Sequence, residues 1–244
     1  MFSVIWFVHK NLRNQARICP QKCGGLPLNI VVLGGLLSTK TSLDGWKKVQ
    51  RDVTFQLNKL KSQESFGVED ILALSYYDLP YYLKPCVLYL GCFPEDSEIA
   101  KKKLTRLWIA EGFIPTTARE ESEEIVEDIA EQFLGELVDR CMVQVDKTDH
   151  TGTGVKTWRM HDLMRDFCMS KAREGNFFKT IQRHEMNMAT TSNSAQHLAT
   201  THSRRIAIHL GCDLSRYQVH PHIRSLLFFD VTTLFVLPLN KQEF

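Results

Sequence analysis

The sequence shows neither a charge imbalance nor closely paired cysteines, and both absences narrow its function. Its 244 residues hold 30 lysine and arginine residues against 28 aspartate and glutamate residues, so net charge gives no case for a polyanion partner. The seven cysteines form no CxxC pair and are odd in number. This pattern favours a reducing compartment over a disulfide framework.

Long hydrophobic runs are also missing. The apolar segment 1–8 is too short to cross a membrane, and no basic residue or small-residue cleavage site accompanies it as in a signal peptide. We therefore expect a cytoplasmic chain without an integral membrane segment. A phosphate-binding loop of the form GxxxxGK[ST] is absent, which excludes the P-loop way of cradling a triphosphate. The remaining composition, 43% hydrophobic and 24% charged, is that of a globular protein.

The segment 155–175 changes its hydrophobic period in the middle. Residues 155–160 alternate as in a short strand, and helical spacing follows in Leu163, Met164, Phe167, Cys168 and Ala172. Asp162 is then a candidate N-cap and Gly175 a candidate helix stop. His161 would lie at a helix N-terminus, where free N–H groups favour an anion. The alternative is that Asp162 only caps the helix and His161 is an ordinary loop residue.

The chain before this segment is predicted to be helical. Pro27 suits the first turn of a helix over 28–37, in which Gly34 and Gly35 predict close packing. Ser42 is a candidate N-cap for a second helix, and a polar linker over 61–67 leads to further helices. Alternation at 142–145 and 155–160 predicts a hairpin with a long tip. Helices, a hairpin and a last helix together form a winged-helix pattern.

A winged helix raises the hypothesis of DNA binding, which the charges of the preceding helix oppose. Residues 120–139 contain no lysine or arginine, but contain the acids Glu120, Glu121, Glu123, Glu124, Glu127, Asp128, Glu131, Glu136 and Asp139. Such a face repels phosphate. We interpret it as a solvated acidic surface.

The C-terminal part predicts strands. Residues 176–203 are polar and read as an exposed connector, and apolar runs at 206–210 and 223–229 lie about 20 residues apart, as in leucine-rich repeats. Histidines gather here with one cysteine (His197, His202, His209, Cys212, His220 and His222), but their spacings match no usual zinc pattern. Cys168 is the cysteine nearest His161 in sequence, and its apolar position predicts a core residue rather than a catalytic partner.

Four segments carry a family resemblance. Residues 23–28 read CGGLPL, residues 83–96 read LKPCVLYLGCFPED, residues 107–114 read LWIAEGFI and residues 160–163 read MHDL. In this order they resemble four segments of plant coiled-coil-type nucleotide-binding leucine-rich-repeat (NB-ARC-LRR) disease-resistance proteins. These are the GLPL motif, the segment that ends in FPED, the segment that follows it and the MHD motif. Residues 204–209 and 223–229 continue the resemblance more loosely.

The resemblance implies a mainly α fold. Its expected parts are an unassigned segment over 1–21, a helical ARC subdomain over 22–66, a winged-helix subdomain over 67–178, a linker over 179–203 and the beginning of an α/β solenoid of leucine-rich repeats over 204–244.

The resemblance also implies a nucleotide site. Pro27 and Leu28 would line the adenine side of an ADP pocket, His161 would reach the β-phosphate, and Met160 and Asp162 would be regulatory. Asn29 stands where the family usually has alanine. The P-loop and the Mg-binding strand of the family have no counterpart here. We therefore expect no enzymatic activity, and weak or absent binding of ADP or ATP by this chain alone.

The implied function is the regulatory part of a plant innate-immune receptor in defence and the hypersensitive response. It would be an ADP/ATP-dependent switch whose MHD motif latches the ADP-bound inactive state. Expected partners are other domains or copies of the receptor family, pathogen effectors and guarded host proteins, without direct nucleic-acid contact. The expected location is the cytoplasm, with peripheral association at the plasma membrane. Two alternatives stay open: a truncated protein-interaction module without nucleotide binding, and a winged-helix nucleic-acid binder.

Overall fold

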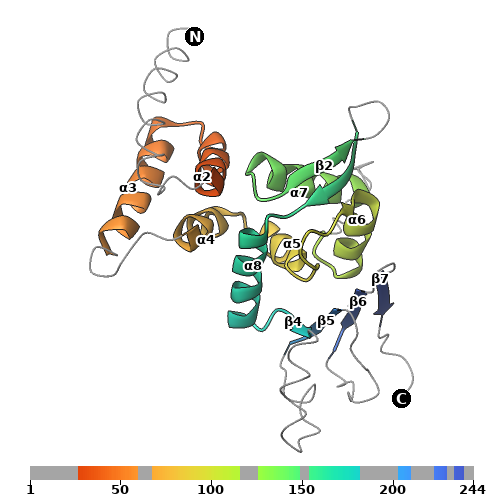
Figure 1. Ribbon diagram of the computed structural model, residues 1–244. Helices are drawn as coiled ribbons and strands as arrows, with labels where there is room; N and C mark the ends of the chain where they lie inside the picture. The colour runs from red at the N-terminus through yellow and green to blue at the C-terminus, as the bar shows by residue number, and fades with distance from the viewer. Residues whose placement is uncertain are drawn as a thin grey trace, which may run out of the picture. The chain divides into compact units, whose positions relative to one another are not determined.

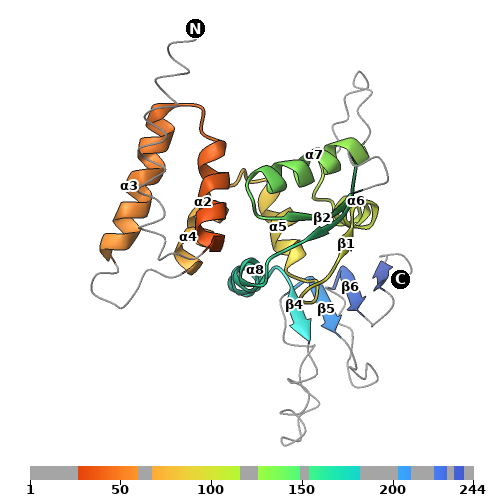
Figure 2. The ribbon, with the colours of Figure 1, turned by 45° about the horizontal axis from the view of Figure 1, so that its top comes forward.

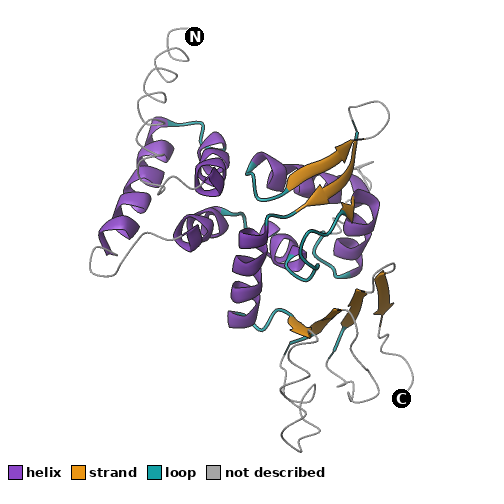
Figure 3. Cartoon of the chain, viewed as in Figure 1, coloured by secondary structure: helices purple, strands orange, loops and turns teal. Residues whose placement is uncertain are grey.

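The computed structural model describes residues 27–59, 68–115, 126–148, 154–181, 203–209, 223–229 and 234–238 (Figure 1). The fold divides into two compact units. The first unit combines Met1–Lys84 with Glu98–Phe167, and the second unit combines Pro85–Ser97 with Cys168–Phe244. The described residues are mostly helical with some sheet (Figure 3), which confirms a mainly α chain. None of the helices among them is long and apolar enough to span a membrane.

The described part of the first unit begins with three helices: α2 (Pro27–Ser38), α3 (Leu43–Lys59) and α4 (Val68–Asp78). Ser42 caps α3 as predicted, because its Oγ accepts a hydrogen bond from the Gly45 N–H group at 3.1 Å. α4 packs on both α2 and α3, although the predicted boundary at 66/67 groups it with the elements after it. We call α2, α3 and α4 the helical part of the first unit.

A small sheet and two helices complete the first unit. β1 (Ile99–Ala100), α6 (Lys101–Ala110), α7 (Val126–Asp139), β2 (Gln144–Thr148) and β3 (Val155–Arg159) form its winged part. The strands are antiparallel in the order β1-β3-β2, so the predicted hairpin is confirmed. β1 has only two residues, which are too few to produce a hydrophobic period, and no sequence pattern predicts it. α5 (Leu83–Leu90) and α8 (Asp162–Glu174) each run from one unit into the other.

Three helices end in the same way, with a left-handed residue just after the last turn. These residues are Gly112 (φ 73°) after α6, Cys141 (φ 56°) after α7 and Asn176 (φ 48°) after α8. In each case two backbone N–H groups bond back to the last turn, as in a Schellman motif. The predicted stop at Gly112 is confirmed. α8 ends at Glu174, so the predicted stop at Gly175 is confirmed, but the left-handed residue after this helix is Asn176.

The second unit contains a four-stranded sheet in the order of its sequence: β4 (Lys179–Ile181), β5 (Arg205–His209), β6 (Ser225–Phe229) and β7 (Leu234–Pro238) (Figure 2). β4, β5 and β6 are parallel and β7 is antiparallel. A buried apolar cluster lies on the sheet: Ile181, Ile206, Ile208, Ile223 and Leu226, with Phe228 at its margin. The strands predicted at 206–210 and 223–229 are confirmed. β4 occupies the first residues of the range expected to be a connector.

His209 attaches β5 to the loop that follows α5 in the second unit. Its Nε2 lies 2.8 Å from the Cys92 carbonyl oxygen, and its ring contacts that of Phe229, which in turn contacts Phe93. The other histidines of the C-terminal cluster and Cys212 lie outside the described residues. Within the described ranges, no group of three potential metal ligands comes together.

Candidate anion-binding junction at the start of α8

The junction between β3 and α8 consists of Met160 and His161. β3 ends at Arg159 and α8 begins at Asp162. The Leu163 N–H group donates a hydrogen bond to Nδ1 of His161 at 3.2 Å, and the His161 carbonyl oxygen accepts one from the Arg165 N–H group at 2.9 Å. His161 is therefore the N-cap of α8. The N-cap prediction for Asp162 is wrong, because Asp162 is already helical and supplies only a negative charge to the first turn.

The capping bond fixes which nitrogen of the His161 ring carries the proton. Nδ1 accepts a hydrogen bond, so the neutral ring carries its hydrogen on Nε2. His161 is exposed, and Nε2 can therefore donate to a ligand beside the unpaired N–H groups of the first helical turn. In this tautomer Nδ1 accepts the capping bond while Nε2 is left as a donor to a ligand.

Buried neighbours hold the junction in place on both sides. Trp158 and Met160 are buried at the end of β3, and Met164 and Phe167 are buried on α8. Met160, which the motif predicted to be regulatory, thus anchors the backbone that carries His161. Leu163 is an exception to the apolar stripe, since it is exposed.

The two predicted adenine-side residues lie on α2. Pro27 is exposed at the first helical position, as its missing N–H group permits, and Leu28 is buried. Ile30 and Val31 are apolar but exposed on the same helix. Hydrogen bonds of the described residues connect neither Pro27 nor Leu28 to His161. A shared pocket for these residues stays a prediction.

Cys168 is not equipped for nucleophilic chemistry. Its side chain is completely buried, and burial raises the pKa of its thiol to about 12. A thiol with that pKa holds almost no thiolate at neutral pH. The expectation that Cys168 belongs to the core is confirmed.

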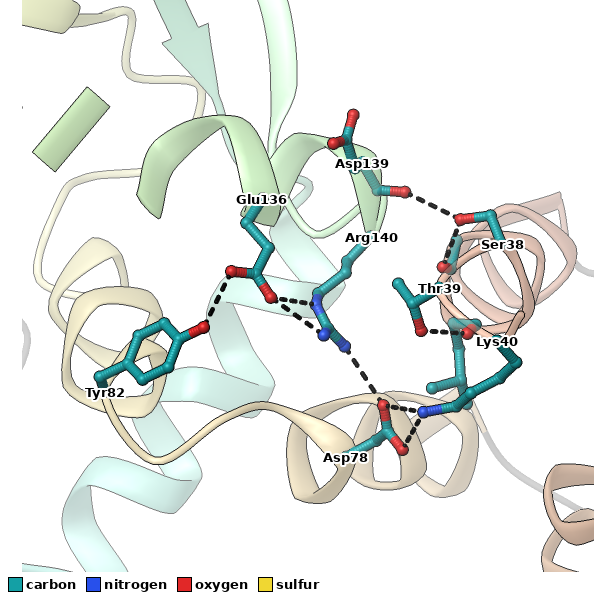
Figure 4. A network of polar contacts seen from close by, with 10 residues as sticks. Ser38, Thr39, Lys40, Asp78, Tyr82, Glu136, Asp139 and Arg140 are labelled. Carbon is teal, nitrogen blue, oxygen red and sulfur yellow. Dashed lines mark hydrogen bonds and ion pairs between the residues drawn. The ribbon is translucent and has the colours of Figure 1, made fainter. Parts of the chain in front are cut away.

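Sequence reasoning missed a network of charged groups in the first unit (Figure 4). Arg140 donates to Oδ2 of Asp78 at 3.2 Å and to Oε1 of Glu136 at 3.0 Å. Lys40 donates to both oxygens of Asp78 at 2.6 and 2.7 Å, and the Tyr82 hydroxyl lies 3.2 Å from Glu136. Burial and the Glu136 carboxylate raise the pKa of Tyr82. These residues lie far apart in sequence, so only their positions at helix ends could have predicted that they form a network.

Comparison with known proteins places the winged part in a family. Residues 92–168 match the family described as the disease resistance protein winged helix domain.

Related proteins of Arabidopsis thaliana match a much longer stretch. The putative disease resistance protein At1g50180 is 38% identical over 208 residues, which cover 84% of this chain and 24% of that protein. The probable disease resistance RPP8-like protein 2 is 38% identical over 225 residues, 90% of this chain and 24% of that protein. The disease susceptibility protein LOV1 is 38% identical over 211 residues, 85% of this chain and 22% of that protein.

The chain therefore belongs to the plant disease-resistance proteins of the NB-ARC type, and it spans about a quarter of the length of these curated relatives.

Proposed function

We propose that this chain is the regulatory part of a plant immune receptor that switches between ADP-bound and ATP-bound states. The observation that carries the proposal is the position of His161 at the N-terminus of α8, with Nδ1 engaged by the Leu163 N–H group. This arrangement leaves an Nε2–H donor beside a helix N-terminus, which suits a phosphate oxygen. The names of the related proteins support a role in plant disease resistance.

The latch would work through differential affinity. If His161 contacts the β-phosphate only in the closed arrangement, bound ADP adds that contact to the closed state alone and shifts the population towards it. Exchange for ATP, or loss of the imidazole, would remove the bias. Asp162 would assist by its charge in the first turn of α8 rather than as the cap.

The sheet of the second unit supports the interpretation of the C-terminal part as the start of leucine-rich repeats. Partner residues on β4, β5 and β6 are about 27 and about 20 residues apart along the chain, within the ~20–29-residue period of that repeat class. The antiparallel β7 departs from the repeat pattern.

A second candidate function is a protein-interaction module that works without nucleotide. The exposed apolar side chains Ile30 and Val31 on α2 favour it, since such residues gather at surfaces that meet other proteins. Direct nucleic-acid binding has the charge of α7 against it: the exposed residues Glu127, Asp128 and Glu131 would face a phosphate backbone with like charge.

A chimeric receptor tests the switch. Residues 22–244 would replace the matching segment of RPP8-like protein 2, and the purified chimera would be denatured and assayed for released nucleotide by chromatography. We expect about one ADP per chain, less ADP in the His161→Ala variant, and pathogen-independent cell death when that variant is expressed in leaves. A His161→Ala chimera that keeps its ADP and stays silent would refute the latch.

The isolated chain provides a second measurement. We expect it to carry no nucleotide after purification, because the family's P-loop has no counterpart in its sequence. Bound ADP near one per chain would show instead that the residues around His161 and Pro27 suffice for a pocket.

A further inference from the structure

One short segment connects the helical part of the first unit to the elements that follow. α4 ends at Asp78 and α5 begins at Leu83, so residues 79–82 are the covalent link. All other attachment of the helical part to the winged part is non-covalent. What holds the two together therefore decides whether the link acts as a hinge.

Three helix C-termini meet beside this link. Ser38 ends α2, Asp78 ends α4 and Asp139 ends α7. Their contact is close: a Cβ on Gly35 of α2 would lie 2.3 Å from the Arg140 carbonyl oxygen, and Ser38 Oγ lies 3.4 Å from the Asp139 carbonyl oxygen. Each helix C-terminus carries a partial negative charge, so the three ends repel one another unless cations lie between them.

Two cations lie there, and their partners join all three helices (Figure 4). Lys40, just after α2, and Arg140, just after α7, both bind the Asp78 carboxylate of α4. Arg140 also binds Glu136 of its own helix. The Arg140 side chain is only 9% exposed, against 28% for Asp78 and 32% for Glu136. We call Lys40, Asp78, Glu136 and Arg140 the clasp.

The charge balance of the clasp is uneven. Lys40 and Arg140 are the cations, whereas the negative side includes Asp78, Glu136 and three helix ends. Loss of a cation therefore leaves uncompensated negative charges in a partly buried site, which is costly. Loss of the Asp78 charge leaves the cations still facing negative helix ends. The two kinds of substitution should have unequal effects.

We propose that the clasp is a conformational latch that holds the C-termini of α2 and α4 on that of α7, and that the helical part swings about residues 79–82 when it opens. The contacts of the clasp involve neither a nucleotide nor His161, so the clasp stands apart from the His161 switch proposed above. A second contact, the edge-to-face pair of Tyr76 on α4 and Phe167 on α8 with ring centroids 5.7 Å apart, contains no clasp residue.

Amide hydrogen exchange of the complete 244-residue chain tests the latch without any nucleotide. The reporter amides are those of Lys40, Leu79 and Met142, whose bonds close the ends of α2, α4 and α7. We expect Arg140→Gln to accelerate their exchange at least about tenfold. The amides of Glu111 and Gly112 at the end of α6 should keep their parent rates.

The remaining variants separate a latch from general destabilisation. Lys40→Gln should accelerate exchange at the reporter amides relative to the parent, but less than Arg140→Gln does. Asp78→Asn should also accelerate it less than Arg140→Gln. Arg140→Lys should behave more like Arg140→Gln than like the parent, because lysine cannot hold Asp78 and Glu136 together. The control Glu131→Gln removes an ion pair with Lys101 inside the winged part and should leave the reporters unchanged. Should Arg140→Gln fail to fold, Lys40→Gln provides the test by itself.

Two results would overturn the proposal. One is equal acceleration at the α6 amides, which would mean that the whole unit is destabilised. The other is parent-like exchange at the reporters in both Lys40→Gln and Arg140→Gln.

Discussion

The backbone amide of Leu163 donates its hydrogen bond to the Nδ1 atom of His161, and 3.2 Å separate the two nitrogens. A single imidazole thus closes the first turn of α8 and fixes its own tautomer. Substitutions at this position can separate the structural role from the ligand role.

Replacement of His161 should show how much the cap contributes. His161→Ala should lower the free energy of unfolding by about 1 kcal/mol, because the Leu163 N–H group loses its acceptor. His161→Asn should retain most of the stability, since asparagine is a good N-cap, but lacks the imidazole donor. Urea unfolding followed by circular dichroism measures both. Equal losses in the two variants would contradict the capping role.

Adjacent glycines on α2 should respond in opposite directions to the same change. Gly35→Ala places a methyl group against the Arg140 backbone and should destabilise by about 1–3 kcal/mol. A Cβ on Gly34 would meet no atom within 4 Å, so Gly34→Ala should stabilise by about 0.5–1 kcal/mol through helix propensity. Thermal unfolding of the pair gives the answer, and a gain in both would mean that α2 does not lie close to Arg140.

The left-handed residue after α7 offers a stabilising substitution. Cys141 has φ 56°, a conformation that costs about 1–2 kcal/mol for a residue with a Cβ. Cys141→Gly should therefore raise the free energy of unfolding by up to about 1 kcal/mol after the entropy cost of glycine. Cys141→Ala is the matched control, because it removes the thiol and keeps the Cβ. A similar gain in both variants would assign the effect to the thiol.

Two buried thiols should make the chain less stable in alkali. Burial raises the pKa of Cys86 and Cys168 from 9.0 to about 12, so the folded chain holds these protons more tightly than the unfolded chain. Their contribution is complete below pH 9 and is lost as the pH rises towards 12.

Urea unfolding between about pH 8 and about pH 10.5 should reveal this loss. Cys168→Ala should reduce the decline by up to about 1.4 kcal/mol per pH unit, the value for one proton. The exposed Ser170→Ala serves as control and should keep the slope of the parent. Parallel slopes in all three proteins would show that Cys168 titrates alike in both states.

Sequence pattern is sufficient where a local rule decides the structure. The β2–β3 hairpin, the stop at Gly112 and the cap at Ser42 follow from alternation, left-handed geometry and side-chain capping. The glycine pair on α2 predicts the close packing found at Gly35, although nothing in the sequence identifies Arg140 as its neighbour.

Features that depend on distant segments lie beyond sequence pattern. β4 is a strand because β5 pairs with it, while its own residues are polar enough to resemble a connector. The clasp joins Lys40 to Asp78 and Asp78 to Arg140, 38 and 62 residues apart. At the start of α8 the sequence pattern predicts Asp162 as the N-cap, but the structure has the ring of His161 in that role.

The second unit has a consequence for synthesis on the ribosome. Its early segment, residues 85–97, is translated long before the strands that complete it: Cys92 precedes its partner His209 by 117 residues. At ~5–20 residues per second, this interval lasts about 6 to 23 s. During this interval Phe229, whose ring contacts that of Phe93 in the folded chain, has not yet been synthesised. We therefore expect nascent chains that end between residues 97 and 205 to be the ones that hold chaperones longest.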